Sequence, residues 1–356
     1  MKPNNLITWL RENDATRLAE LWREADAVRE RFVGDAVHLR GLVEFSNHCV
    51  RQCGYCGLRA SNQKVRRYRL SAEDILSCAR HAASVGYGTV VLQSGEDPEV
   101  EKDWLSGVIR TIKNETPLAV TLSVGERSRE ELAAWREAGA DRYLLRFETS
   151  NRSLYDRVHP PRPNQDRSDR LETLGTLREL EYEVGSGVMI GIPGQTYQDL
   201  ARDVNLFAKL NLDMIGCGPY VPHPETPLGR AGQDAADLGR EQVPPSELMT
   251  YKLIALARLA CPRANIPSTT ALATINPRNG HELALRRGAN VVMPNVTPES
   301  HRKSYEIYPD KAAIYERVAQ SSSPLRQRIA ALGRHVGTAR GDSPNYLERH
   351  DRAIRP

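Results

Sequence analysis

Eight short apolar runs rich in β-branched residues recur along the chain, and segments with helical spacing separate them. The runs are VHLRGLVEFS (37–46), TVVLQSGE (89–96), AVTLSVGE (119–126), RYLLRFET (142–149), VGSGVMIGI (184–192), MIGCGPYV (214–221), NIPSTTAL (265–272) and NVVMPN (290–295). Strands that alternate with helices are typical of a parallel sheet. Eight such units predict an α/β fold, a (β/α)8 barrel of the TIM type, or a six-stranded open sheet if the last two runs are not strands.

The segments between these runs have helix start and stop signals. In LSAEDILSCARHAASVG (70–86), Ser71 is the expected N-cap, Asp74 stands at the third helical position and Gly86 ends the helix. RSREELAAWREAGA (127–140) and QTYQDLARDVNLFAKLN (195–211) follow the same logic. GIPGQT (191–196) lacks the lysine and the spacing of a phosphate-binding loop, so we interpret it as a turn into a helix capped near Thr196.

No low-complexity linker divides the chain. We expect a helical extension over 1–35 that packs outside the barrel, the barrel itself over 36–310, and a helical or irregular tail over 311–356. The stretch RHVGTARGDSPNYLERHDRAIRP (334–356) is basic and loose in composition, which predicts a solvated and partly mobile tail. Residues 225–246 are expected to form a long loop before a helix.

The bulk properties limit the possible partners and the compartment. No stretch approaches the ~20 apolar residues of a membrane span, and residues 1–22 indicate amphipathic helices rather than a signal peptide. A net charge of +4 without a long basic run in the first 340 residues does not favour nucleic acid. We expect a cytoplasmic monomer with no membrane contact, in which clustered thiols are metal ligands rather than disulfides.

The polar segments of the chain fall where the predicted strands end. Chemistry in a (β/α)8 barrel takes place at the carboxyl ends of the strands. QSGED, SVGE, RFET, PYVPHPETP, STTA and MPNVTP all follow at that end. FSNHCVRQCGYCGLR (45–59) directly follows the first strand and holds Cys49, Cys53 and Cys56 in the spacing C-x3-C-x2-C.

These three cysteines favour an iron–sulfur cluster. Three thiolates can hold three corners of a [4Fe–4S] cube and leave the fourth iron open to a ligand. A structural zinc with His48 as fourth ligand is an alternative, although adjacent residues rarely point at one metal. A closed electron-transfer cluster is another, although it would usually have a fourth cysteine. The remaining cysteines are scattered and are expected in the core: Cys78, Cys217 and Cys261.

The cysteine segment, with Tyr55 before its last cysteine, resembles the signature of the radical S-adenosylmethionine enzymes. Over about residues 30–310, further motifs such as VVLQSGEDP, GSGVMIGIPGQT, GPYVPHPETPL and NIPSTTALATINP resemble the [FeFe]-hydrogenase maturase family HydE. They match that family better than biotin synthase, which needs a second set of cluster ligands in the barrel, or methylornithine synthase. The resemblance implies that S-adenosylmethionine binds the open iron of a [4Fe–4S] cluster and is reductively cleaved to a 5′-deoxyadenosyl radical.

The resemblance also implies roles for individual residues. Cys49, Cys53 and Cys56 would ligate the cluster, and the residues expected to bind S-adenosylmethionine are Tyr55, Ser94, Gly95, Glu96, Glu148, Arg170 and Met293. The residues expected to line the substrate site are Gln93, Thr121, Arg146, Thr269, Thr270 and Tyr305. Several of these residues could instead have a purely structural role. Arg170 could face solvent, and Glu148 and Arg146 could form an ion pair. Packing or strand-end hydrogen bonds are the alternative for Gln93, Met293 and the two threonines. His223 is expected to be a loop histidine rather than a metal ligand.

For function, the resemblance implies a small cysteine-derived, sulfur-containing or iron-bound substrate on the way to the hydrogenase H-cluster. A reduced electron donor such as ferredoxin or flavodoxin, and other hydrogenase maturases, are the expected protein partners. Some members of the family bind a second cluster through three further cysteines, but YPDKAAIYERVAQSSSP (308–324) has none, so we predict a single cluster. Two alternatives remain: a radical enzyme acting on another amino acid, as in methylornithine formation from lysine, and a non-catalytic iron–sulfur or metal-binding protein.

Overall fold

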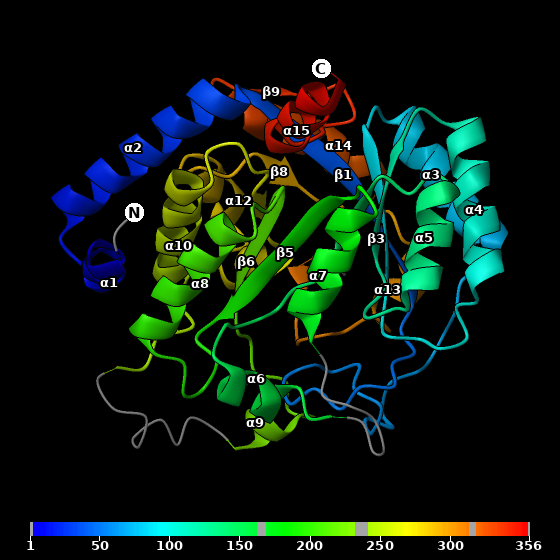
Figure 1. The fold of residues 1–356 in the computed structure, drawn as a ribbon, viewed down its shortest axis with the longest axis horizontal. Coiled ribbons are helices and arrows are strands. Elements are labelled where there is room, and N and C mark those ends of the chain that lie inside the picture. Colours follow the sequence, from blue (N-terminus) through cyan, green and yellow to red (C-terminus); the bar gives the residue numbers. More distant parts are fainter. Residues whose placement is uncertain (1–2, 162–168, 232–240, 313–317, 355–356) are drawn as a thin grey trace.

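Strands and helices alternate along the chain (Figure 1) in the computed structural model, which describes residues 3–161, 169–231, 241–312 and 318–354. The strands are β1 (Ala36–Ser46), β2 (Thr89–Ser94), β3 (Ala119–Ser123), β4 (Arg142–Leu144), β5 (Glu183–Ile190), β6 (Met214–Pro219), β7 (Pro267–Ser268), β8 (Val291–Val292) and β9 (His335–Val336). The helices up to β5 are α1 (Pro3–Arg11), α2 (Ala15–Val33), α3 (Ala72–Ser84), α4 (Lys102–Glu115), α5 (Arg129–Glu137), α6 (Arg152–Val158) and α7 (Arg170–Glu179). The later helices are α8 (Tyr197–Lys209), α9 (Pro227–Arg230), α10 (Glu247–Ala260), α11 (Thr270–Ile275), α12 (Gly280–Leu285), α13 (Glu299–Arg302), α14 (Val318–Ala330) and α15 (Pro344–Ile354).

The first eight strands form a barrel of parallel strands. Their order is β6-β5-β4-β3-β2-β1-β8-β7, and every ladder between neighbours is parallel. The ring closes between β6 and β7, where Met214 forms a parallel bridge with Asn265 and the Ile215 amide donates to the Asn265 carbonyl at 2.9 Å. The predicted (β/α)8 fold is therefore confirmed, and the open six-stranded alternative is not adopted.

The predicted helix starts are formed by reciprocal caps. Ser71 with Asp74, and Thr196 with Asp199, make capping boxes in which each side chain accepts from the backbone of the other. The predicted end of the first of these helices is also confirmed, because α3 stops at Ser84 and Gly86 adopts a φ of 76°. The three scattered cysteines lie buried, as expected: Cys78, Cys217 and Cys261.

The predicted strands are right in position, but some are too long. The run 265–272 yields a strand of only two residues, because Thr269 accepts from the Leu272 amide and caps a helix that begins at Thr270. The run 142–149 likewise ends early as a regular strand, and Glu148 turns into the left-handed region with a φ of 63°. Within the expected loop 225–246 the structure has a one-turn helix at Pro227–Arg230, and residues 232–240 lie outside the described residues.

The two N-terminal helices pack outside the barrel against α8 and α10 (Figure 1). Asp14 caps α2 by accepting from the Arg17 amide, and Gly34, with a φ of 82°, turns the chain into β1. None of the helices in the described ranges is long and apolar enough to cross a membrane.

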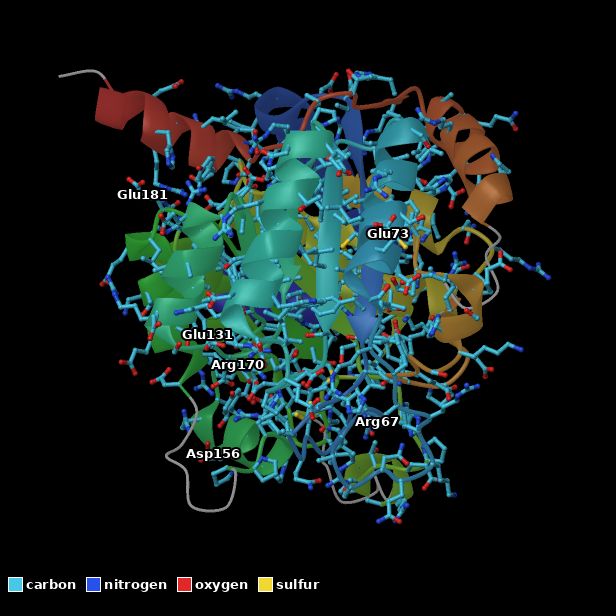
Figure 2. The ribbon with its side chains drawn as sticks, turned by 90° about the vertical axis from the view of Figure 1, so that its right-hand side faces the viewer. Arg67, Glu73, Glu131, Asp156, Arg170 and Glu181 are labelled. Carbon is cyan, nitrogen blue, oxygen red and sulfur yellow. The ribbon has the colours of Figure 1, made fainter. Side chains whose placement is uncertain are left out.

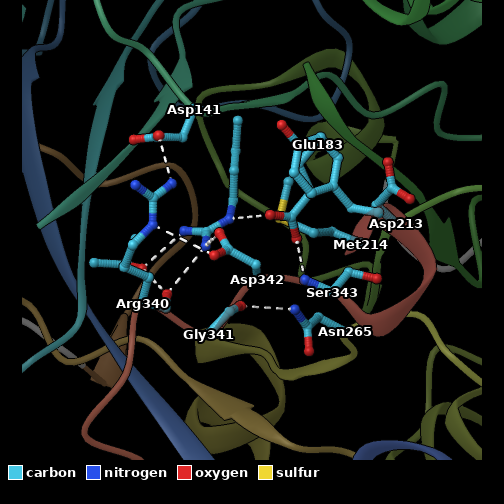
Figure 3. A network of polar contacts seen from close by, with 12 residues as sticks. Asp141, Glu183, Asp213, Met214, Asn265, Arg340, Gly341, Asp342 and Ser343 are labelled. Carbon is cyan, nitrogen blue, oxygen red and sulfur yellow. Dashed lines mark hydrogen bonds and ion pairs between the residues drawn. The ribbon is translucent and has the colours of Figure 1, made fainter. Parts of the chain in front are cut away.

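The C-terminal segment 334–343 lies across the amino-terminal ends of the barrel strands. Strand β9 pairs with the start of β1, with Ala36 opposite His335. The Gly341 carbonyl accepts from Arg40 Nη2 and from Asn265 Nδ2, both at 3.0 Å (Figure 3). The prediction of a solvated tail is therefore wrong for this stretch.

A buried ion pair explains why the tail is held there. Arg142 and Glu183, at the starts of β4 and β5, are almost fully buried and paired with each other. The tail supplies further partners, since Arg142 Nη2 donates to the Arg340 carbonyl at 3.0 Å and contacts Asp342 at 2.5 Å. The Ser343 amide donates to Glu183 Oε1 at 3.0 Å. Buried charges require hydrogen-bond partners, and the tail satisfies these two.

Candidate active site

A cavity of about 330 Å³ lies inside the barrel, between the cysteine loop at the carboxyl ends of the strands and Arg40 near the other end. Every predicted site residue lines it: Cys49, Cys53, Tyr55, Cys56, Gln93, Ser94, Gly95, Glu96, Thr121, Arg146, Glu148, Arg170, Thr269, Thr270, Met293 and Tyr305. Residues from different strands therefore converge on one space, as the pattern of polar strand ends predicted. The structure gives their placement, and their roles stay predictions.

The cysteine loop between β1 and α3 is fixed by backbone hydrogen bonds to three other loops. The Val50 amide donates to the Glu96 carbonyl after β2 at 3.0 Å, and the Gly54 amide donates to the Val158 carbonyl of α6 at 2.8 Å. The Gly57 amide donates to the Ile307 carbonyl at 2.9 Å. The loop therefore has a defined conformation over the barrel mouth.

Two glycines are required by close approach of other backbone. A Cβ on Gly95 would lie 2.2 Å from the His48 carbonyl oxygen and 2.8 Å from Cys49 Cβ. A Cβ on Gly57 would lie 2.3 Å from the Glu306 carbonyl oxygen and 2.6 Å from Nε2 of His223. The φ of Gly57 is not positive, so glycine is needed there for the space it leaves for its neighbours and not for a special backbone conformation. His223 is a loop residue whose Nδ1 accepts from the Glu225 amide.

The three cysteines are crowded and withdrawn from solvent. Cys53 is buried, and Cys49 and Cys56 are partly buried. Burial raises the pKa of all three thiols, to about 12 for Cys56, and the charges of neighbouring cysteines raise the pKa of Cys53 and Cys56 further. Cationic iron stabilises the thiolates that this environment disfavours. A [4Fe–4S] cube takes each thiolate at a separate corner, and the three thiols that line this one cavity are donors of that kind. The donor set thus fits a cluster.

Buried arginines and carboxylates surround the cysteine loop. Arg51, between two of the cysteines in sequence, contacts Glu126 Oε1 at 2.9 Å and Glu96 Oε1 at 3.7 Å. Arg170 Nε donates to Glu126 Oε1 at 2.9 Å, and its Nη1 donates to the Arg146 carbonyl at 2.6 Å. The Arg170 side chain is only 10% exposed, so it faces the cavity and not solvent. Figure 2 shows Arg170 toward the loop-rich end of the barrel, to which Arg67 and Asp156 also belong.

Glu148 lies in the cavity wall in a strained backbone conformation. Its φ of 63° is rare for a residue with a side chain, and such strain occurs often at functional sites. The Glu148 amide donates to the Gly187 carbonyl, and its own carbonyl accepts from Met189, so β5 holds the turn in place. Its carboxylate contacts Arg146 Nη2 at 2.9 Å, and its Oε1 lies 3.3 Å from Tyr55 Oη. The ion pair expected as an alternative is present, and it lies inside the cavity.

Polar atoms on the substrate side of the cavity lack protein partners. In the described structure, neither the buried Thr121 Oγ1 nor the Arg146 Nε has a hydrogen-bond partner. Gln93 Nε2 donates to Tyr305 Oη at 3.3 Å. Buried polar groups normally have hydrogen-bond partners, so these two groups can bind a polar group that enters the cavity. Thr269 differs, because its hydroxyl accepts from the Leu272 amide and serves as a helix cap.

The structure adds residues that the sequence did not single out. His159 lies buried beside Tyr55 and Cys53, and Arg51 lies under the cysteine loop. Lys311 and Glu44 form a buried pair at the cavity wall. Only the position of Arg51 inside the cysteine motif could have drawn attention to it. The sequence around His159 has no comparable signal, because a short helix separates it from the strand end.

The barrel and its cysteine loop define a class of enzyme. The family described as "Radical SAM superfamily" matches residues 43–207. The [FeFe] hydrogenase maturase subunit HydE of Thermotoga maritima is 44% identical to this chain, covering 94% of this chain and 92% of HydE. The chain belongs to the radical S-adenosylmethionine superfamily, as an enzyme of the group that contains HydE. Members of that superfamily use a [4Fe–4S] cluster and S-adenosylmethionine.

Two further comparisons concern methylornithine synthase. The 3-methylornithine synthase of Methanosarcina acetivorans is 29% identical to this chain over 77% of this chain and 74% of that enzyme. A crystal structure of methylornithine synthase superposes with a TM-score of 0.76 over 94% of both chains, at 24% sequence identity. This likeness to a solved structure supports the barrel fold described above.

Proposed function

We propose that this enzyme binds a single [4Fe–4S] cluster through Cys49, Cys53 and Cys56 and cleaves S-adenosylmethionine in the barrel cavity. When bound, the reduced cluster supplies the electron that converts S-adenosylmethionine into methionine and a 5′-deoxyadenosyl radical. The observation that carries the proposal is that the three buried thiols open into the same cavity as Glu148 and Arg170. A single cluster is proposed because the other three cysteines of the chain are buried and scattered.

The residues near the thiols would orient S-adenosylmethionine. The Arg170 guanidinium can exchange its contact with Glu126 for a carboxylate, which arginine binds with paired hydrogen bonds. Glu148 would accept hydrogen bonds from the amino acid or the ribose. The strand end formed by Ser94, Gly95 and Glu96 would receive the amino group, and Tyr55 and Met293 would flank the adenine. Holding the sulfonium next to the electron donor replaces a chance encounter with a fixed geometry.

The deeper part of the cavity would hold a small substrate with a carboxylate. The residues proposed to line this part are Gln93, Thr121, Arg146, Thr269, Thr270 and Tyr305. Arg146 has one unpaired Nε, and Thr121 has an unpaired hydroxyl, so both can bind a polar group. The identity of 44% to a hydrogenase maturase supports a cysteine-derived, sulfur-containing or iron-bound substrate on the way to the H-cluster. A reduced ferredoxin or flavodoxin would then supply electrons, and other maturases would be partners.

A second candidate function is the formation of a methylornithine-type product from lysine. The identity of 29% to 3-methylornithine synthase supports it, and lysine also has a carboxylate that Arg146 could bind. The two candidates differ in substrate but share the cofactor site. Assays with lysine and with cysteine-derived thioethers, followed by mass spectrometry of the products, would therefore distinguish them. A methylornithine product would overturn the maturase assignment.

Release of 5′-deoxyadenosine tests the proposed chemistry. The anaerobically reconstituted protein is incubated with dithionite and S-adenosylmethionine, and the nucleoside is measured by liquid chromatography. Cys53→Ala should abolish release. Cys78→Ala, which removes a buried thiol of α3 that does not line the cavity, should retain it. Release by the Cys53→Ala variant at the wild-type rate would overturn the cluster assignment.

A further inference from the structure

A buried histidine connects a cysteine of the cluster loop with the aromatic residue of the same loop. Cys53 Sγ lies 3.2 Å from Nδ1 of His159, and Tyr55 Oη lies 2.8 Å from Nε2 of the same ring. Both ring nitrogens of His159 are therefore used. Because Cys53 and His159 are 106 residues apart in sequence, the contact depends on the fold and not on local geometry.

The imidazole of His159 has little freedom to move. His159 is 3% exposed and forms the C-cap of α6, where its amide donates to the Tyr155 carbonyl at 2.7 Å. The Tyr155 ring stacks on it with a centroid distance of 4.9 Å, and the Tyr55 ring meets it edge-on at 5.3 Å. Pro160 follows and restricts the backbone of His159. The ring is therefore held at the cysteine in advance of any ligand.

The partners of His159 determine which atom donates and which atom accepts in each of its two hydrogen bonds. A thiolate that ligates iron can only accept a hydrogen bond, so Nδ1 must carry the proton that faces Cys53. A neutral imidazole that carries its proton on Nδ1 accepts at Nε2, which lies 2.8 Å from Tyr55 Oη. Tyr55 then donates its hydroxyl proton to His159.

We propose that His159 is a positioning residue of the cluster site, which donates a hydrogen bond to the ligating sulfur of Cys53 and fixes Tyr55 through its other nitrogen. Hydrogen bonds to the sulfurs of an iron–sulfur cluster stabilise the more negative, reduced form and raise its reduction potential. His159 therefore makes the cluster easier to reduce. This inference depends on the proposed function, because it requires a cluster on Cys53.

The same hydrogen-bond direction has a consequence for Glu148. If Tyr55 donates its single hydroxyl proton to His159, it does not donate it to Glu148, although Glu148 Oε1 is only 3.3 Å away. Oε1 of Glu148 then stays available to a donor in the cavity, such as a hydroxyl or ammonium group of S-adenosylmethionine. His159 would thus influence both the cluster and the acceptor that binds its ligand.

The midpoint potential of the reconstituted cluster tests the proposal. A redox titration followed by electron paramagnetic resonance compares wild type, His159→Phe, which removes both ring nitrogens, and His159→Gln, which keeps a side-chain N–H donor. We expect a more negative potential in His159→Phe and a smaller shift in His159→Gln. An unchanged potential in His159→Phe would overturn the proposal.

His48 provides a matched control. It is next to Cys49 in sequence, but across the described residues its ring makes no hydrogen bond with a cysteine sulfur. His48→Gln should leave the potential close to that of wild type. A shift as large as that of His159→Phe would overturn the proposal, because the effect would then not depend on the bond to Cys53.

A second measurement does not need a folded His159→Phe variant. In wild-type protein labelled with ¹⁵N-histidine, pulsed electron paramagnetic resonance of the reduced cluster should detect coupling to a histidine nitrogen, and His159→Gln should lose it. Absence of the coupling in wild type, or its persistence in the variant, would overturn the inference. Failure of the wild-type protein to form a cluster that responds to S-adenosylmethionine would instead count against the proposed function.

Discussion

Tyr55 Oη lies 3.3 Å from Oε1 of Glu148, so the cysteine loop after β1 touches the turn that follows β4. The two residues follow strands that are separated by β2 and β3 in the barrel order, and they meet in the wall of the cavity. Glu148 is also one of four described residues other than glycine with a positive φ. The proposed cofactor site therefore contains a carboxylate, that of Glu148, which a strained turn holds next to the cysteine loop.

Glu148→Gln tests the role of this carboxylate. The substitution removes the charge and keeps the shape, so the cluster should form normally while S-adenosylmethionine binds more weakly. Charge-assisted hydrogen bonds contribute about 1.5–3 kcal/mol, which predicts a rise in Kd of roughly 10- to 100-fold in a titration followed by electron paramagnetic resonance. Glu99→Gln, at a side chain 71% exposed that does not line the cavity, should bind as wild type. Equal affinity in both variants would remove Glu148 from the cofactor site.

Gly95→Ala tests the close contact between β2 and the cysteine loop. The added methyl group would lie 2.2 Å from the His48 carbonyl oxygen and must displace the loop that holds Cys49. We expect a large loss of iron and sulfide per chain after reconstitution. Gly107→Ala is the control, because a Cβ on this residue of α4 meets nothing within 4 Å. Alanine in a helix should stabilise that variant by about 0.5–1 kcal/mol. Full cluster loading of Gly95→Ala would contradict the described loop packing.

The partly buried His38 of β1 predicts a dependence of stability on pH. Burial, and next to it the charges of Arg40 and Arg142, lower the pKa of His38 to about 4. The unfolded chain protonates this residue below about pH 6.5, whereas the folded chain does so only near pH 4. Stability is therefore complete above pH 6.5 and decreases as the pH falls from 6.5 toward 4.

A comparison with His38→Gln isolates this contribution. Between pH 7.5 and pH 5.5 the wild type should lose about 1.4 kcal/mol more than the variant, because the unfolded chain takes up nearly one proton more than the folded chain across this interval. Urea denaturation at the two pH values measures the difference, and all other titrating groups are shared. If the two proteins lost the same free energy of unfolding between these pH values, His38 would not be held neutral beneath the C-terminal segment.

The buried pair under the barrel predicts a large stability effect of Glu183→Gln. Arg142 would lose its carboxylate partner on β5, while its contact with the carboxylate of Asp342 in the C-terminal segment would remain. Breaking a buried ion pair lowers the free energy of unfolding by about 3–5 kcal/mol. Urea denaturation should show a loss near the lower end of this range, because Asp342 still contacts Arg142. Glu179→Gln breaks a pair with Arg129 in which both side chains are more than half exposed, and should have little effect. Equal stability of the two variants would contradict the described network.

The sequence predicts the barrel well because its signals are local and repeat. Each strand run is apolar, and caps such as Ser71 and Thr196 mark the helix starts. The convergence of polar strand ends follows from the topology of a parallel barrel. The assignment of Gln93 and Tyr305 to one site rests instead on the family resemblance, and the two side chains are hydrogen-bonded to each other in the structure.

The other features depend on contacts between distant segments. The C-terminal segment looks solvated from its composition, but Gly341 and Ser343 satisfy buried groups at the starts of strands. His159 has no motif, and its use becomes visible only when α6 brings it to Cys53. None of these pairings has a local pattern that a sequence could show.

Electron paramagnetic resonance of the reduced, anaerobically reconstituted protein, recorded with and without S-adenosylmethionine, tests the central claim most directly. We expect one [4Fe–4S]⁺ signal that changes when S-adenosylmethionine is added, because an iron without a protein ligand binds it. A signal that S-adenosylmethionine leaves unchanged, or a protein that takes up no cluster, would contradict the proposed site of Cys49, Cys53 and Cys56.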